Sequence, residues 1–196
     1  MEHLKEYITE ELAISVKTKE KFVKENLGQL MKAVELMAQV TLNGGKIIYF
    51  GNGGSAADSQ HLAAEHVNKL RVQRAALPAI AITTDTSAIT SIANDLSFDE
   101  IFSRQIEAVG NKNDLAFGIS TSGNSSNVIR GLQVARQMGM KTISMTGGSG
   151  GRISSEDLAD VVLNVDNSNV SSRIQETHIF IGHILIELMD KILMTK

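Results

Sequence analysis

The chain opens with helical periodicity and then changes to short apolar runs. Residues 2 to about 42 carry apolar positions at three- and four-residue spacing and predict two helices, the second ending at Asn43-Gly44-Gly45. Five apolar runs follow, each succeeded by a small polar loop and a helical pattern: Ile47 to Phe50, Ala79 to Ile82, Leu115 to Ile119, Thr142 to Met145 and Val161 to Val165. This alternation predicts an α/β fold, in which a five-stranded parallel sheet has helices on both faces and follows an N-terminal helical segment.

A final helix is predicted from about Ser171 to the end of the chain. Its stretch from Ile174 to Leu193 is too apolar for a helix lying alone on a surface, so we expect it to be buried against another subunit. Polar side chains in such a segment need partners, because an unpaired polar group in apolar surroundings costs free energy. These are Arg173, Gln175, Glu176, His178 and His183. We interpret His178 as a core histidine, with a ligand role as the alternative.

Composition narrows the class of protein. The 196 residues, 42% of them hydrophobic, are enough for one core, and we expect one domain spanning residues 1–196. The formal net charge of -3 argues against a chain that coats nucleic acid or anionic lipid. Without cysteine there is no disulfide, thiolate metal site or cysteine nucleophile. The N-terminus lacks the layout of a signal peptide, which favours a cytoplasmic protein with no membrane or nucleic-acid partner.

A glycine-rich loop follows the first predicted strand. Residues 51–58 (GNGGSAAD) open a helix, their glycines let a ligand approach the backbone, and Ser55 and Asp58 have the spacing of a capping box. The loop also matches the loose dinucleotide fingerprint GxGxxA. The acidic residue of that fingerprint is expected about 20 positions on, but Asp85 follows Ala56 by 29. A dinucleotide site and a plain strand-to-helix turn remain the alternatives to a phosphate-binding loop.

A hydroxyl-rich loop follows the third predicted strand. Residues 120–127 (STSGNSSN) precede a helix from Val128 to about Met138 and carry five hydroxyls within seven residues. The free N–H groups and partial positive charge at a helix start suit an anion. No lysine follows as in GxxxxGK[ST], so the loop predicts a sugar phosphate rather than a nucleoside triphosphate. The alternative is that Ser and Asn merely cap the helix.

Histidines and carboxylates form a second candidate group. His61 and Glu65 stand four residues apart, which places them on one face of the helix that the glycine loop opens. They could hold a divalent metal or form a solvated pair, whereas His66 points elsewhere and is expected to be structural. On the last helix, Gln175 and His183 are eight residues apart, about 12 Å of rise and roughly 80° of rotation. Their side chains could still converge.

Five segments in this order resemble a known family: FGNGGSAADSQHLAAEH, TTDTSA, IANDLSFDEIFSRQIEAVG, GISTSGNSSNVI and SSRIQETHIFIGHIL. They resemble the sedoheptulose 7-phosphate isomerases, also called phosphoheptose isomerases, of the sugar isomerase (SIS) fold. The resemblance covers nearly the whole chain. It implies a flavodoxin-like SIS domain that includes the N-terminal helices, and a homotetramer with active sites at subunit interfaces.

The resemblance also implies an activity and a set of residues. The activity is isomerisation of sedoheptulose 7-phosphate to D-glycero-D-manno-heptose 7-phosphate, a step towards heptose for lipopolysaccharide or capsule. The implied substrate-binding residues are Asn52, Gly53, Ser55, Asp95, Ser120, Thr121, Ser122, Ser125 and Gln175. The implied ligands of one zinc ion per subunit are His61, Glu65, Gln175 and His183. Glu65 and His183 also match the family's catalytic pair.

This chemistry needs a base for a carbon-bound proton, an acid for the oxygen and stabilisation of the enediol charge. We assign Glu65 as base and His183 as acid, with zinc as Lewis acid. Tight zinc binding would lower the basicity of Glu65, so the ligand and base roles both stay open. Where many family members have Gly-Arg-Tyr, this chain has Asn68-Lys69-Leu70. Only Lys69 could then replace the arginine contact, and a point charge is not a planar fork.

The competing interpretation is a binding module. The same fold occurs in the DnaA initiator-associating protein, which needs no isomerase chemistry. That relative lacks the catalytic carboxylate and the second imidazole, whereas this chain has both Glu65 and His183. The presence of this pair favours the enzyme.

Overall fold

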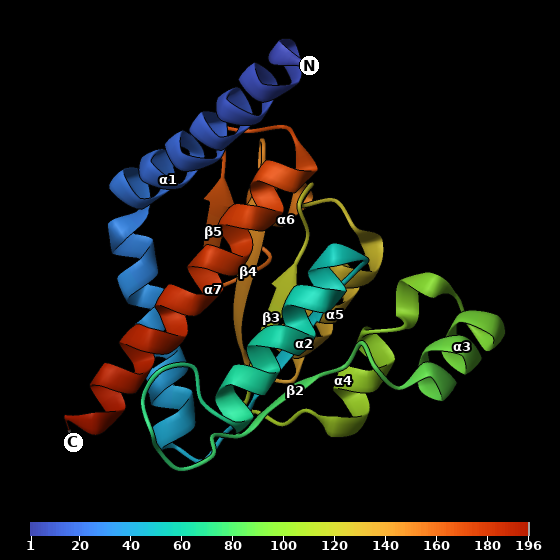
Figure 1. The fold of residues 1–196 in the computed structure, drawn as a ribbon. Helices are drawn as coiled ribbons and strands as arrows, with labels where there is room; N and C mark the ends of the chain where they lie inside the picture. Colours follow the sequence, from blue (N-terminus) through green and yellow to red (C-terminus); the bar gives the residue numbers. More distant parts are fainter. Residues whose placement is uncertain (196) are drawn as a thin grey trace.

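The computed structural model describes residues 1–195. Its centre is a parallel five-stranded sheet of order β2-β1-β3-β4-β5, the flavodoxin-like order, which confirms the predicted fold class (Figure 1). The strands are β1 (Ile47–Gly51), β2 (Ala79–Ala81), β3 (Leu115–Ile119), β4 (Lys141–Gly147) and β5 (Val161–Val165). The strands β3 and β5 have their predicted bounds, β1 and β2 differ by one residue at their ends, and β4 begins one residue earlier and ends two residues later than predicted.

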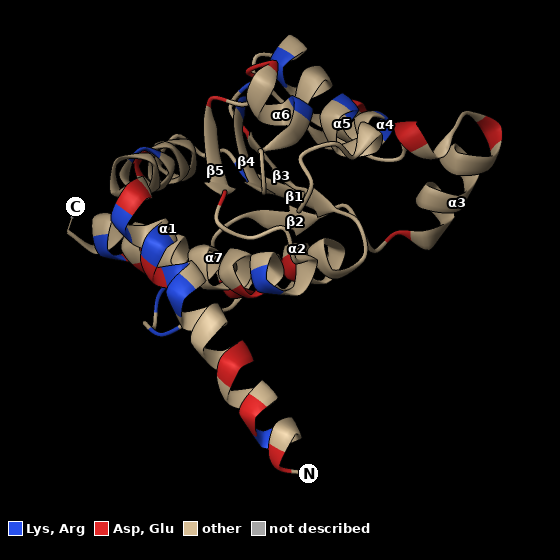
Figure 2. Cartoon of the chain, turned by 90° about the horizontal axis from the view of Figure 1, so that it is seen from above, with Lys and Arg blue, Asp and Glu red and all other residues tan. Residues whose placement is uncertain are grey.

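Helices cover both faces of the sheet. Figure 2 shows α1 (Glu2–Leu42), α2 (Gly54–Val67) and α7 (Ser171–Met194) on one face, with α4 (Ser103–Val109), α5 (Ser126–Gln137) and α6 (Gly151–Ser155) on the other. Side chains of a strand point alternately to the two faces. Accordingly, Ile47 and Tyr49 of β1 belong to the core under α2 and α7, and Ile48 and Phe50 belong to the core under α5.

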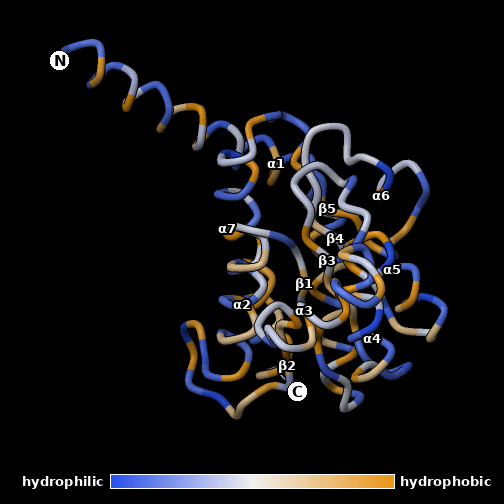
Figure 3. The backbone as a smooth tube through the Cα atoms, turned by 90° about the vertical axis from the view of Figure 1, so that its right-hand side faces the viewer, coloured by the Kyte–Doolittle hydropathy of each residue, from blue (hydrophilic) through white to orange (hydrophobic). Residues whose placement is uncertain are grey.

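The two predicted N-terminal helices are joined as α1, with a kink at Asn26. The backbone of Asn26 leaves helical geometry (φ -119°, ψ 15°), and its side-chain amide donates a hydrogen bond to the carbonyl of Phe22 at 3.0 Å. The first turns of α1 project from the body of the molecule and expose Leu4, Ile8 and Leu12 (Figure 3). Within residues 1–195, no helix has both the length and the apolar character required for crossing a membrane.

The cover of the last helix differs from the prediction. The sequence suggested that the apolar stretch of α7 is buried against another subunit, but much of this stretch packs within its own chain. Ile181, Leu185 and Met189 lie in one core with Val34 and Met37 of α1. The prediction overstated the need for a partner because the second half of α1, far away in sequence, lies along α7.

Candidate functional site

Helices α2 and α7 lie side by side and run in the same direction on one face of the sheet (Figure 1). Their backbones approach closely at Gly182, where an added Cβ would stand 2.5 Å from Leu62 Cδ2. The two helices also touch near their N-terminal ends, at Gly54 of α2 and Gln175 of α7. An added Cβ at Gly54 would lie 2.4 Å from the amide nitrogen of Gln175. This close packing brings the polar residues of the two helices together.

Three of the four predicted zinc ligands meet at the α2–α7 contact. The Nε2 atoms of His61 and His183 are 2.9 Å apart, although the two residues are 122 positions apart in the chain. Glu65 Oε1 lies 3.5 Å from His61 Nε2, on the same face of α2. The fourth predicted ligand, Gln175, does not join this group. Its amide packs on Gly54, which precedes His61 by seven residues, or about two turns of α2.

The donor types suit zinc, which prefers imidazole nitrogen and carboxylate oxygen in proteins. Their present spacing is that of a hydrogen-bonded imidazole pair, and among residues 1–195 no three His, Asp or Glu side chains form a metal-binding cluster. Two nitrogens that bind one tetrahedral zinc ion at about 2.05 Å would lie about 3.3 Å apart. The donor atoms are therefore of the kind that zinc prefers. To bind one zinc ion together, the imidazole rings of His61 and His183 would need to move apart by about 0.4 Å.

The surroundings of His183 lower the pKa of its imidazole. Partial burial and, after it, the nearby charge of His61 lower the pKa of His183, while the carboxylates of Glu65 and Glu187 act in the opposite direction. Glu187 forms an ion pair with Arg71, whose Nε lies 3.0 Å from Glu187 Oε1. The net effect disfavours imidazolium, so His183 can accept a metal ion or donate its remaining N–H.

The positive charge beside this group is Arg71, not the residue that the sequence suggested. Lys69 was the expected substitute for the family arginine, but its Nζ donates to Gln73 Oε1 at 2.7 Å. Arg71, two residues on, has the planar fork that Lys69 lacks, and its charge acts on His183. Matching residues to the family by position did not identify Arg71, because its orientation towards Glu187 of α7 depends on the course of the loop after α2.

The hydroxyl-rich loop connects β3 to α5, and the side chain of its last residue before the helix does not cap α5. Ser125 is the N-cap of α5, yet its hydroxyl pairs with that of Ser120 at 2.9 Å. Ser122 Oγ accepts a hydrogen bond from the backbone of Asn124 at 3.2 Å. The capping alternative is therefore wrong for Ser125, and a pair of hydroxyls faces the start of the helix, where an anion is favoured.

The two predicted loops are joined through their amides. Asn52 donates to Asn127 Oδ1 at 2.8 Å, and Asn127 donates back to Asn52 Oδ1 at 2.9 Å. Asn127 is 2% exposed and was not singled out in the sequence, where it reads as one more polar residue of the loop. Because β1 and β3 are neighbours, this pair holds the glycine and hydroxyl loops together at the crevice where open parallel sheets bind ligands.

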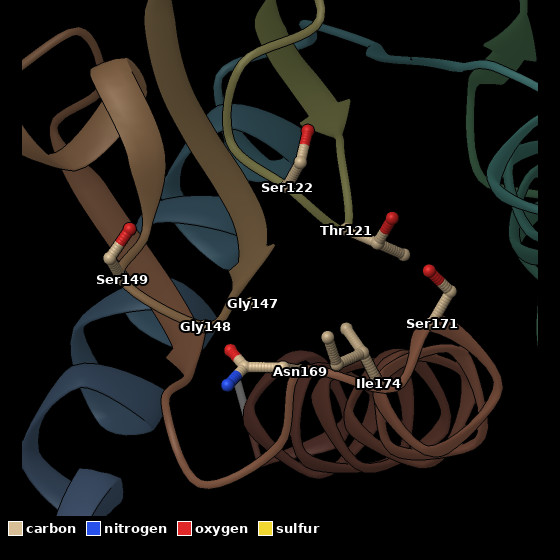
Figure 4. Close-up of a pocket in the computed structure, with 8 residues that line it drawn as sticks. All are labelled: Thr121, Ser122, Gly147, Gly148, Ser149, Asn169, Ser171 and Ile174. Carbon is tan, nitrogen blue, oxygen red and sulfur yellow. The ribbon is translucent and has the colours of Figure 1, made fainter.

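A cavity of about 230 Å³ opens beside the hydroxyl loop (Figure 4). It is formed by that loop, the end of β4 and the start of α7, through Thr121, Ser122, Gly147, Gly148, Ser149, Asn169, Ser171 and Ile174. Two of the predicted substrate residues, Thr121 and Ser122, line it. The serines and asparagine from the later segments have no distinctive spacing in the sequence, so only the fold assigns them to this wall.

The structure also places the three aspartates that the sequence analysis considered, Asp58, Asp85 and Asp95. The helix after the glycine loop begins with Gly53 as N-cap, which has no side chain to accept a hydrogen bond from the first turn, so the capping box of Ser55 and Asp58 is wrong. Asp85 caps α3 (Thr86–Asp95) by accepting from the backbone of Ala88 at 2.9 Å, which gives it a structural role. Asp95, the predicted sugar contact, is exposed at the end of α3, which projects to one side of the sheet (Figures 1 and 2).

Two histidines near the site are buried, as predicted for structural residues. His178 donates from Nε2 to the carbonyl of Thr146 at 2.9 Å, and burial lowers its pKa to about 4. His66 pairs with the Tyr49 hydroxyl at 2.8 Å, and burial together with the charge of Arg74 lowers its pKa to about 3. Both rings are neutral in the folded protein, and the Nδ1 atom of each lacks a hydrogen-bond partner among the described residues.

This burial predicts a loss of stability in acid. Below pH 6.5 the unfolded chain takes up protons on both rings and the folded chain does not, so the free energy of unfolding falls as pH falls towards 4. At pH 5 each ring should contribute a loss of about 2 kcal/mol. Urea unfolding of the wild type and of His178→Gln at pH 7.5 and 5.0 measures the difference, with His3→Gln as an exposed control. An equal pH dependence in all three proteins would contradict this expectation.

The fold and site belong to a known class. The SIS domain model matches residues 12–147, more than half of the chain, which makes this a SIS-domain protein. Phosphoheptose isomerases from Pelodictyon phaeoclathratiforme and Desulfovibrio desulfuricans are 46% and 49% identical to it, over 96% and 93% of this chain and 89% and 86% of theirs.

Solved structures agree with this placement. The phosphoheptose isomerase from Neisseria gonorrhoeae superposes with a TM-score of 0.88 at 43% identity, over 96% of this chain and 99% of that one. The corresponding enzyme from Francisella tularensis gives 0.89 at 33% identity, over 95% and 97%. The chain belongs to the phosphoheptose isomerase family.

Proposed function

We propose that this protein is an aldose–ketose isomerase that converts sedoheptulose 7-phosphate into D-glycero-D-manno-heptose 7-phosphate through an enediol. The observation that carries the proposal is the meeting of His61 and Glu65 with His183 in a member of the phosphoheptose isomerase family. A carboxylate and an imidazole in reach of one another are the base and acid that a carbonyl shift requires. The binding-module alternative has no use for this pair.

The substrate phosphate would bind between the glycine and hydroxyl loops. The start of α5 and the hydroxyls of Ser120, Thr121, Ser122 and Ser125 are suitable donors, and Asn52, Gly53 and Ser55 lie across the crevice at the start of α2. Ser55 precedes His61 by about 9 Å of helix rise, a span that an extended seven-carbon sugar phosphate can cover. Asp95 and Gln175 would complete the contacts to the sugar.

Glu65 would remove the carbon-bound proton, and His183 would deliver a proton to the substrate oxygen. Glu65 is only partly exposed, which limits competition from water for its carboxylate. The surroundings of His183 lower its pKa and so favour the neutral imidazole, which has one N–H to donate. Arg71 and Glu187, which pair with one another, would act on this imidazole through their charges.

Zinc, one ion per subunit, would be held by His61, Glu65, Gln175 and His183, and it would polarise the substrate oxygens as a Lewis acid. The proposal extends to a cytoplasmic homotetramer of single SIS domains, residues 1–196, with active sites at subunit interfaces. Two features support association: the exposed apolar residues before the kink of α1, and an apolar groove lined by Leu27 and Met31 of α1 and Phe180, Ile184 and Leu188 of α7.

The direct test is an assay with sedoheptulose 7-phosphate and protein purified without chelator. We expect an aldose heptose phosphate to form and metal analysis to find about one zinc per chain. No conversion with or without added zinc would contradict the proposed activity. Full activity in protein without stoichiometric metal would contradict the zinc proposal and leave a metal-free acid–base route.

A further inference from the structure

The proposed base occupies a position that is weak in an isolated helix. Glu65 lies two residues before the end of α2 at Val67. The last four carbonyls of a helix have no partner within the helix, so its final turn frays unless other groups bind them. A catalytic carboxylate must be held within about 0.5 Å of its productive position. Something outside α2 must therefore fix this turn.

Arg74, in the loop after α2, binds that turn. Its guanidinium donates to the carbonyl of Glu65 at 2.9 Å and to the carbonyl of His66 at 2.8 Å. A positive charge at a helix C-terminus is also favoured by the helix dipole. The Arg74 side chain is only 8% exposed, so water screens these contacts little. Arg74 thus supplies the cap that the sequence of α2 itself lacks.

The same guanidinium ties this cap to α7. Arg74 Nε donates to Asp190 Oδ1 at 2.7 Å, and the Asp190 side chain is 1% exposed. Asp190 follows His183 by seven residues, two helical turns, and so lies on the same face of α7. One buried ion pair therefore links the turn that carries Glu65 to the helix that carries His183.

We propose that Arg74, held by Asp190, is a positioning residue that fixes the carboxylate of Glu65 relative to the imidazole of His183. This inference rests on the proposed function, because it gives Glu65 and His183 the acid–base roles. It depends on the planar fork of arginine, which binds the two carbonyls of the last turn of α2 and the carboxylate of Asp190 at once, beside weaker contacts to carbonyls of its own loop. A lysine could keep the charge near Asp190 but could not make all three contacts.

The test compares Arg74→Lys and Asp190→Asn with the wild type. We expect kcat to fall by roughly ten- to a hundredfold, since small misplacements of reacting groups cost that much, while KM stays within about twofold because neither residue touches the substrate. Circular dichroism checks that each variant folds. Asp190→Asn retains the shape of the side chain and carries the test alone if Arg74→Lys does not fold.

A matched control separates positioning from stability. Asp114 is also 1% exposed and ion-paired, to Lys46, but among the described residues its carboxylate accepts hydrogen bonds only from Lys46 and Asn111 and from no residue of α2 or α7. Asp114→Asn should lower the melting temperature and leave kcat at the wild-type value. A similar loss of kcat in Asp114→Asn and Arg74→Lys, or a change in KM alone, would overturn the inference.

Hydrogen exchange provides a readout that does not need activity. The amide of Asn68 bonds to the carbonyl of Ala64 at 2.9 Å in the last turn of α2. In Arg74→Lys, amides of residues 65–68 should exchange about tenfold faster or more, while those of β3 should not change. Unchanged exchange would overturn the inference. An inactive wild type with this exchange pattern would instead refute the proposed function and leave the clamp established.

Discussion

Glu65→Gln is expected to lower kcat for sedoheptulose 7-phosphate by about 10²- to 10⁴-fold, the usual contribution of a general base. The amide has nearly the shape of the carboxylate but cannot accept the proton, so folding and KM should change little. His183→Ala should cause a loss of similar size. Glu107→Gln is the control, because Glu107 is an exposed carboxylate that pairs with Arg104 on α4. Near-normal turnover in both site variants would refute the assigned mechanism.

The zinc content of Glu65→Gln distinguishes the two roles of this residue. A variant that keeps its zinc and loses turnover identifies Glu65 as the base. A variant that loses zinc identifies it as a ligand whose removal disables the site. The position of Glu65 suits both roles, since its Oε1 is 3.5 Å from His61 Nε2 and the two side chains share one face of α2.

Gly123→Ala is expected to raise KM by roughly tenfold or more. Gly123 has φ +65°, and an added Cβ would stand within 1.9 Å of the carbonyl oxygen of Gly150, which cannot yield as a side chain does. The hydroxyl loop must then separate from the loop before α6, which moves Ser120 and Ser122 away from the phosphate. Steady-state kinetics and inorganic phosphate competition measure the change in affinity.

The control for this prediction is Gly139→Ala. Gly139 has φ +77°, so alanine there suffers a similar backbone strain, about 1 kcal/mol or more, but its Cβ would meet nothing nearer than Lys112 Cβ at 3.8 Å. It should lower the melting temperature and leave KM unchanged. An equal KM for Gly123→Ala and the wild type would show that the hydroxyl loop does not bind the phosphate.

Much of the fold could be predicted because local pattern and tertiary environment agree. A strand buried on both faces must be apolar throughout. The segment from Leu115 to Ile119 has this property in its own sequence, so it could be recognised without knowing what packs on it. The sequence predicted two helices where α1 has a kink at Asn26, but the packing of the second half of α1 on α7 could not be predicted, because a contact between distant segments leaves no period in the sequence. The need for a second subunit around α7 was overstated for this reason.

The candidate site divides in the same way. The glycine loop, the hydroxyl loop and the pair His61 and Glu65 were identified from the sequence, since each is a set of residues close together in the chain whose geometry follows from one turn or one helix. Arg71 and Asn127 were missed, because a lone polar residue in a loop has no local signal. Their importance comes from partners 116 and 75 positions away, Glu187 for Arg71 and Asn52 for Asn127.

The sequence by itself determined the parallel sheet, the order of its elements and the two loops at the carboxyl ends of its strands, because hydrophobic period and loop chemistry are local properties. Only the tertiary structure decided that His183 meets His61, and that Arg74, held by Asp190, caps the C-terminal end of α2. The same holds for the position of Asp95 at the end of the projecting helix α3. The first two facts depend on how closely α2 and α7 approach, and Gly182 allows that approach although no pattern in the sequence indicates it.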